Sequence, residues 1–143
     1  SRVDVFRERL EYHGIKEDCF IQRSLQDSSS VGESFVAGLV SKYPGGKYPF
    51  DAVWATCDEG AAALTSHFVK SGYRVPEDIA VVGFNNNETS QYMTPQLASV
   101  ERKNTEAMES IIKMLMNRIE NPDSPFAKET IHMEFIPRKS AGY

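Results

Sequence analysis

Apolar residues fall into two kinds of segment along the chain: short continuous runs, and stretches in which they recur every three or four positions. The continuous runs are typical of strands buried in a sheet, and they lie at 19–21, 50–56, 79–84 and 97–100. The recurring pattern predicts amphipathic helices, and these lie at 2–13, 31–40, 58–71 and 105–119. Apolar and polar residues alternate at 130–135, which predicts a strand with one buried face.

The order of these segments indicates the fold class. Strand and helix alternate with short polar connectors over residues 1–95, which favours right-handed crossovers. The 143 residues of the chain are the usual length of one domain. We therefore predict an α/β fold with a parallel sheet flanked by helices.

Composition and charge exclude several classes. Apolar residues make up 41% and charged residues 25%, as in ordinary folded domains, which excludes disorder and fibrous repeats. The net charge of −4 has the wrong sign for a surface that neutralises many phosphates, so these residues are not expected to grip DNA. No apolar run is long enough to span a bilayer and no basic-then-apolar leader opens the sequence, so neither membrane insertion nor secretion is indicated.

The residues of common catalytic and metal sites are sparse. Cys19 and Cys57 occur without a CxxC motif or a Cys/His cluster, which predicts free thiols in a reducing cytoplasm and no metal. The three histidines form no nucleophile–base arrangement, and GxSxG, P-loop and GxGxxG motifs are absent from the sequence. We therefore predict no catalytic residue and no cofactor.

Polar residues follow two of the predicted strands, where open parallel sheets bind their ligands. The first group is 57–59, whose adjacent carboxylates Asp58 and Glu59 suit a helix start better than acid/base catalysis. The second group is 85–87, three consecutive asparagines. Their amides suit hydroxyl-bearing ligands, and asparagine is also a common turn residue, so both interpretations stay open.

A longer segment resembles a known family. Residues 73–86, YRVPEDIAVVGFNN, are similar to the signature of the LacI/GalR family of bacterial transcription regulators. The similarity continues through 92–100, YMTPQLASV, and through the predicted helix to 137–140, PRKS. Upstream, 50–64 resembles the family's strand and following helix start, and the first residues resemble its Arg-x-x-Gly-Phe helix.

The resemblance implies a fold and a division of the chain. The family's effector domain is of the periplasmic-binding-protein-like type I and consists of two Rossmann-like subdomains. Residues 1–95 and 128–143 correspond to its carboxyl-terminal subdomain, whereas 96–122 form a strand and helix that cross to the amino-terminal subdomain. A DNA-binding headpiece, a hinge helix and the amino-terminal subdomain are not recognised in these residues. We expect the 105–119 helix, without that subdomain, to pack against a second copy or against its own sheet.

The resemblance also implies ligand contacts. Arg2 matches the family's ligand-binding arginine, whose forked guanidinium donates to two acceptors. Asp58 matches the acidic residue at a helix start, and Cys57 stands where the family often has asparagine. For both Arg2 and Asp58 a plain surface or capping role is the alternative.

Three further positions depart from the family pattern. Asn85 matches an aspartate that usually accepts hydrogen bonds from sugar hydroxyls, and its neutral amide both donates and accepts. Arg102 stands where glutamine is usual. Asp27 lies near a position that often holds an aromatic residue stacked on the ligand. These departures leave the particular effector open.

The resemblance implies the effector-sensing part of a cytoplasmic transcription regulator, with a sugar or sugar derivative as the small-molecule effector. It also implies a homodimer, paired through the helix at 61–68 and the segment 90–93, and operator DNA bound by the headpiece and not by these residues. A periplasmic sugar-binding transport protein of related fold is the alternative. An enzyme acting on sugars is a third hypothesis, and it requires an acid/base pair that the sequence does not supply.

Overall fold

The structure is a computed structural model that describes residues 2–15, 31–102 and 104–143. Its α-helices are α1 (Arg2–Tyr12), α2 (Val31–Lys42), α3 (Asp58–Lys70) and α4 (Asn104–Glu120). Its strands are β1 (Ala52–Trp54), β2 (Ala80–Phe84), β3 (Ala98–Arg102) and β4 (Met133–Ile136). Two 3-10 turns, η2 (Glu88–Tyr92) and η3 (Lys139–Ala141), complete the elements. The predicted helices and strands are confirmed within a few residues, except the strand at 19–21, which lies outside the described residues.

The four strands form one sheet in the order β1-β2-β3-β4. β1, β2 and β3 run parallel, with Trp54 opposite Val82 and Phe84 opposite Val100. β4 pairs with β3 in the antiparallel direction. The α/β prediction is confirmed, and the parallel arrangement holds for the first three strands only. The chain leaves the end of β3 through α4 and comes back to that same end, where Met133 pairs with Arg102, so β4 runs in the opposite direction.

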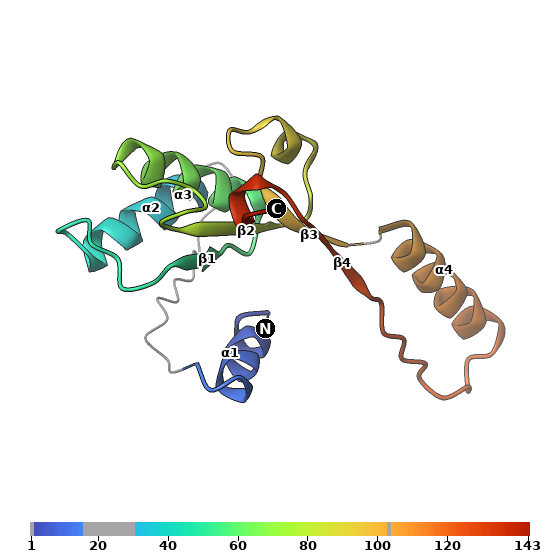
Figure 1. Ribbon diagram of the computed structural model, residues 1–143. Coiled ribbons are helices and arrows are strands. Elements are labelled where there is room, and N and C mark those ends of the chain that lie inside the picture. The colour runs from blue at the N-terminus through green and yellow to red at the C-terminus, as the bar shows by residue number, and fades with distance from the viewer. Residues whose placement is uncertain (1, 16–30, 103) are drawn as a thin grey trace.

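Helices cover both faces of this sheet (Figure 1). In that view α2 and α3 lie above the strands, and α1 lies below them. Pleating places Val81 and Ser99 on the side of α3, whereas Trp54 projects to the other side and its ring lies 4.8 Å from that of Phe6 in α1. The strands are therefore sandwiched, which explains their continuous apolar runs.

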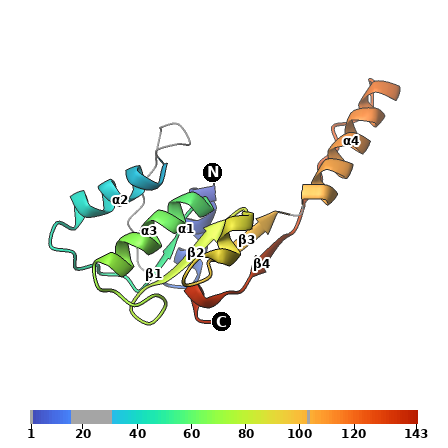
Figure 2. The ribbon, with the colours of Figure 1, turned by 90° about the horizontal axis from the view of Figure 1, so that it is seen from above.

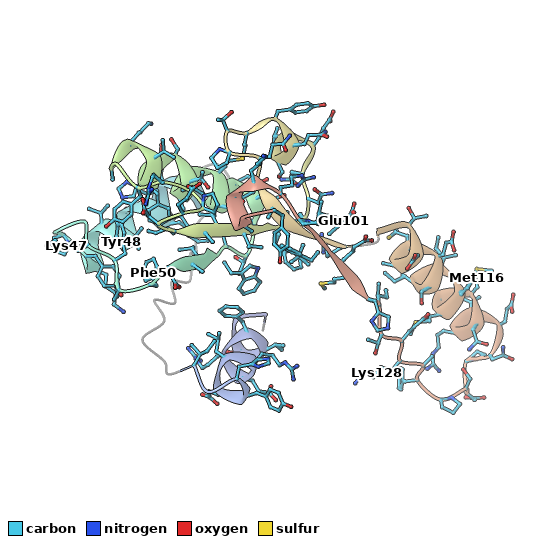
Figure 3. All side chains as sticks on the ribbon, in the orientation of Figure 1. Lys47, Tyr48, Phe50, Glu101, Met116 and Lys128 are labelled. Carbon is cyan, nitrogen blue, oxygen red and sulfur yellow. The ribbon has the colours of Figure 1, made fainter. Side chains whose placement is uncertain are left out.

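The core lies between α2, α3 and the sheet. Its fully buried side chains include Leu39, Phe68, Ile79 and Leu97. An aromatic cluster extends it, in which Tyr48 stacks on Phe50 at 5.6 Å and bonds to His67 through its hydroxyl at 2.8 Å. Figure 3 shows Tyr48 and Phe50 at the end of the molecule far from α4.

α4 stands apart from the sheet (Figures 1 and 2). We call residues 104–132 the arm and the other described residues the body. Within the arm, α4 packs on its return segment: Ser110 donates to Glu129, and the Arg118 guanidinium lies 4.4 Å above the Phe126 ring. Six large apolar residues of α4 are between 48% and 63% exposed, and they are Met108, Ile111, Ile112, Leu115, Met116 and Ile119.

This arrangement corrects two predictions. α4 does not turn onto its own sheet, because its connections at β3 and β4 lead it away from the body; packing against a second copy stays a prediction. The prediction from the alternating pattern at 130–135, a strand with one buried face, is also wrong. Met133, Glu134 and Phe135 are all exposed, because no layer covers β4 there within the described residues.

Candidate functional site

The site is formed at the carboxyl ends of the three parallel strands. Cys57 and Asp58 follow β1, Asn85 follows β2 directly, and Arg102 is the last residue of β3. Because β1, β2 and β3 are neighbours in the sheet, these positions lie along one edge. The structure thus brings four of the six predicted site positions to the same edge.

Asn85 and Asn86 form a turn of unusual backbone geometry. Their φ angles are 105° and 51°, in the region that side-chain-bearing residues rarely adopt. The Asn85 N–H donates to the carbonyl of Val100 at 2.9 Å, which ties the turn to β3. The Asn85 side-chain oxygen is buried and has no hydrogen-bond partner within the described residues. The described residues therefore leave this acceptor at the strand edge unsatisfied.

Asp58 is buried below this turn and accepts three hydrogen bonds. Ser99 Oγ donates to Oδ1 at 2.6 Å, while the Asn87 backbone N–H and Ser90 Oγ donate to Oδ2 at 2.6 and 3.0 Å. The prediction that Asp58 caps α3 is wrong. Cys57 occupies the N-cap position, and the Asp58 carboxylate extends across to β3 and to the loop after β2.

Cys57 lies partly buried beside Glu59. Burial is the largest effect and raises the pKa of the Cys57 thiol. The hydrogen bond of the Gly60 amide opposes it, and Glu59 and Asp58 raise the pKa further by smaller amounts. The thiol is therefore neutral at neutral pH. Glu59 itself accepts a hydrogen bond from the Asn87 side chain at 2.6 Å, which adds a second link between α3 and the loop.

The other predicted site residues are only partly described. Arg2 begins α1, and its side chain lies outside the described part of the structure, as does the whole of Asp27. Arg102 is exposed and pairs with Met133 across the antiparallel ladder. A direct ligand contact by any of these residues stays a prediction.

Residues near the carboxyl end support the site and were missed by sequence reasoning. The Arg138 guanidinium donates to the Asn86 side-chain oxygen and to the Leu97 carbonyl, both at 2.7 Å. Ser140 Oγ accepts from the Ala98 N–H and donates to the Val81 carbonyl, so it bridges β3 and β2. The PRKS segment was noticed for its resemblance, but nothing local in it indicates contacts more than 40 positions away.

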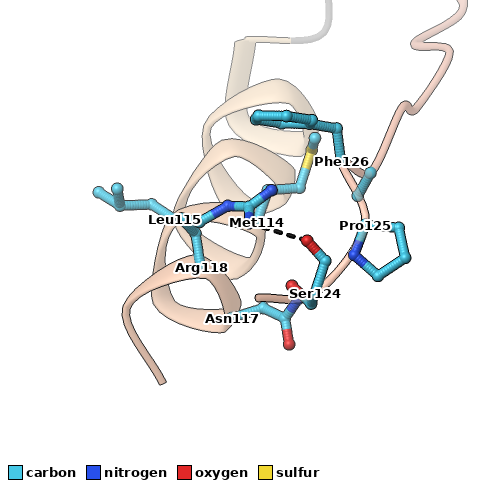
Figure 4. A pocket seen from close by; sticks show the side chains of 8 residues that line it. Met114, Leu115, Asn117, Arg118, Ser124, Pro125 and Phe126 are labelled. Atoms are coloured by element: carbon cyan, nitrogen blue, oxygen red, sulfur yellow. Dashed lines mark hydrogen bonds between the residues drawn. The ribbon is translucent and has the colours of Figure 1, made fainter. Parts of the chain in front are cut away.

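A small hollow lies elsewhere, between α4 and its return segment (Figure 4). It measures about 190 Å³ and is lined by residues that include Met114, Arg118 and Phe126. It is on the arm, away from the strand ends, and it contains no group from the predicted site. Among the described residues there is no cluster of three His, Cys, Asp or Glu side chains that could hold a metal ion. No described helix is both long and apolar enough to cross a membrane.

Comparison with known proteins agrees with this architecture. Residues 1–141 match the family described as the periplasmic binding protein-like domain. The HTH-type transcriptional repressor PurR of Mannheimia succiniciproducens is 32% identical over 89 residues, which are 62% of this chain and 27% of that protein.

Two solved structures superimpose on nearly the whole chain. One is the transcriptional regulator CelR in complex with cellobiose, with a TM-score of 0.82 and 24% identity, over 98% of this chain and 42% of that chain. The other is a LacI family regulator from Enterococcus faecium with bound ribose, with a TM-score of 0.74 and 25% identity, over 98% of this chain and 50% of that chain. This chain thus spans half or less of the length of these proteins. The chain belongs to the periplasmic binding protein-like family, and the relatives that it resembles are transcriptional repressors and regulators, one of them of the LacI family.

Proposed function

We propose that this chain is the effector-sensing part of a LacI/GalR-type transcription regulator, which binds a small polar metabolite at the carboxyl ends of β1, β2 and β3. The observation that carries the proposal is the buried side-chain oxygen of Asn85, which has no partner in the described part of the chain. An unpaired buried acceptor costs free energy, so a donor from a bound effector is favoured there.

Sugars and sugar derivatives are the effector class that we propose. Their hydroxyls donate and accept hydrogen bonds, as the Asn85 amide does, and the exposed Arg102 guanidinium adds forked donors. We propose that Arg2, Asp27 and Cys57 complete the contacts. Two related regulators have cellobiose and ribose bound, which supports a sugar here. The reported relatives are named as regulators, and we assign no catalytic step.

The resemblance assigns 96–122 to a second subdomain, but β3 (Ala98–Arg102) pairs with β2 and β4 in the sheet of the body. We propose that the crossing begins after β3, so that α4 belongs to the second subdomain, whereas 1–95, β3 and 128–143 form the carboxyl-terminal one. The exposed apolar face of α4 supports this division, because a helix of this length is marginal in water without burial of that face. The effector then sits between two subdomains and favours one of their arrangements. Its different affinity for the two arrangements changes how the regulator presents itself to DNA.

We further propose a cytoplasmic homodimer whose operator contacts are made outside these residues, in keeping with their net charge of −4. Ala61 and Phe68 fill the core, so the face of α3 left for a second copy carries Ser66 and Val69. In the 90–93 segment, Tyr92 is 73% exposed. Sedimentation of the full-length gene product at micromolar concentration tests this pairing, and a monomer contradicts it.

A thermal-shift screen of monosaccharides, disaccharides and phosphorylated sugars against the full-length gene product tests the function. A sugar that binds the native state raises the melting temperature by an amount that grows with the ratio of its concentration to its Kd. Asn85→Ala should weaken binding of that sugar by about 1 to 3 kcal/mol in calorimetry and leave folding nearly unchanged. Asn121→Ala, on the exposed end of the arm, is the matched control. A screen without any shift contradicts the proposed effector class, and unchanged affinity of Asn85→Ala contradicts the role of Asn85.

A further inference from the structure

One buried carboxylate holds the turn that carries Asn85. The Asn87 N–H donates directly to Asp58 Oδ2 at 2.6 Å. Ser99 donates to Asp58 Oδ1 at 2.6 Å, and its oxygen in turn accepts the N–H of Asn86 at 3.0 Å. Both backbone amides that follow Asn85 are therefore fixed by Asp58, one directly and one through Ser99.

The turn needs this support because its backbone is strained. Two consecutive residues with side chains, Asn85 and Asn86, have φ angles of 105° and 51°. Such conformations persist only where the surroundings over-determine them. The Arg138 guanidinium adds a further restraint by donating to the Asn86 side chain at 2.7 Å. Loss of these partners should let the turn relax and move the Asn85 amide away from the strand edge.

The carboxylate is enclosed between α3, β2 and β3. Only 2% of Asp58 is exposed, and both of its oxygens already accept protein donors. On the β2 side the space for it exists because residue 83 is glycine: a Cβ there would overlap Asp58 Oδ1. A ligand at the strand edge reaches the turn before it reaches this carboxylate.

We infer that Asp58 is a positioning residue for effector binding: it holds the turn at 85–87 through Asn87 and Ser99 and does not touch the effector. This rests on the proposed function, because it concerns the edge where the effector is proposed to bind. It differs from the direct contact that the family resemblance implies for Asp58. Positioning and direct contact can be told apart by experiment, because Ser99 on β3 links Asp58 to the Asn86 amide. Removal of the Ser99 hydroxyl should therefore loosen the turn while the Asp58 side chain remains.

The first test measures backbone amide hydrogen exchange by NMR in the full-length gene product without any sugar. Ser99→Ala removes the acceptor of the Asn86 N–H and should speed its exchange about tenfold or more. Asp58→Asn should speed exchange at both Asn86 and Asn87. The control is Thr65→Val, which removes a buried hydroxyl that donates to the Ala61 carbonyl within α3 and should leave both amides protected. Unchanged exchange in Ser99→Ala overturns the inference, even where Asp58→Asn fails to fold.

The second test measures binding of D-ribose and of cellobiose by calorimetry. Ser99→Ala should weaken the sugar that binds by about tenfold, and Ser99→Thr, which keeps the hydroxyl, should restore affinity. In an Asn85→Ala background, Ser99→Ala should cause no further loss, since its effect passes through Asn85.

The outcomes separate the inference from the proposed function. Faster exchange with unchanged affinity, or losses that simply add in the double variant, overturns the positioning role while the sugar-binding function stands. If the unmodified protein binds neither sugar in this assay or any in the screen, the proposed function fails. The exchange measurement then still decides whether Asp58 holds the turn.

Discussion

The body and the arm of this molecule use the same amphipathic pattern and reach different results. In the body, α3 presents Ala61, Leu64 and Phe68 to the sheet and all three are buried. In the arm, α4 carries six large apolar residues on one face, and each of them is between 48% and 63% exposed. An amphipathic pattern therefore shows that the apolar face of a helix needs a partner surface. The topology of the chain decides whether that surface lies in the same chain.

The largest expected loss of stability in the body comes from a substitution of Phe68, which is 0% exposed. Phe68→Ala removes a ring from the centre of the body and should lower the free energy of unfolding by about 3–5 kcal/mol. Urea denaturation of the 143-residue chain measures this change. A loss below 1 kcal/mol would show that the body is not packed as described.

A second, smaller effect is expected at Gly83. Ala at this position puts a Cβ into the space of the Asp58 carboxylate, which three hydrogen bonds hold in place. We expect Gly83→Ala to destabilise the body by about 1–3 kcal/mol in the same assay. Gly45→Ala is the control, because a Cβ there meets nothing within 4 Å. Equal stabilities of the two variants would contradict the tight contact.

A substitution in the arm tests whether α4 lacks a partner surface that the helices of the body have. Leu115 is 57% exposed, so Leu115→Ala should change the stability of the 143-residue chain by no more than about 0.5 kcal/mol. In the full-length gene product the proposed second subdomain covers α4, and the same substitution should cost about 2–4 kcal/mol there. The difference between the two denaturation experiments is the quantity to measure. Identical small effects in both would contradict the proposed place of α4 in the second subdomain.

The smallest effect is expected at the surface of the body, in the turn before β2. Hydrogen bonds from the Arg74 guanidinium and backbone lower the pKa of Asp78 from 3.8 to about 2. Because the folded-state pKa is below the unfolded value, the stabilisation is complete well above pH 4 and is lost as the pH falls through 2. Asp78→Asn should therefore lower the melting temperature slightly at pH 7, and the difference should vanish towards pH 2. Glu77→Gln, which removes a neighbouring exposed charge, should lack this pH profile.

Local sequence patterns were sufficient to predict most elements but not their partners. The apolar run at 79–84 and the spacing of apolar residues in 105–119 identified β2 and α4 within one or two residues. This succeeds because the burial of a strand or of a helix face depends on residues that are close in the sequence. The antiparallel direction of β4 was missed, since direction depends on the path of the chain between strands. The exposure of α4 could not be predicted either, because the sequence pattern of a helix does not identify the surface that packs against it.

The same limit applies to the site. Placing Asn85 at the strand edge followed from the run that ends at Phe84. The role of Asp58 did not follow, because its donors Asn87 and Ser99 lie 29 and 41 positions further along the chain. A carboxylate at a helix start looks like an ordinary cap until those positions are brought together. The hydrogen bonds of Arg138 could not be predicted for the same reason.

The bridge made by Ser140 has a consequence for synthesis on the ribosome. Its hydroxyl links the Ala98 amide to the Val81 carbonyl, which lies 59 positions earlier in the chain. The nascent chain can form α3 and pair β2 with β3 as they emerge, but the Val81 carbonyl and the Ala98 amide lack their Ser140 partner until residue 140 has left the exit tunnel. We therefore expect this domain to complete its fold after the arm has been translated, so that α4 emerges while the sheet that precedes it is still unfinished.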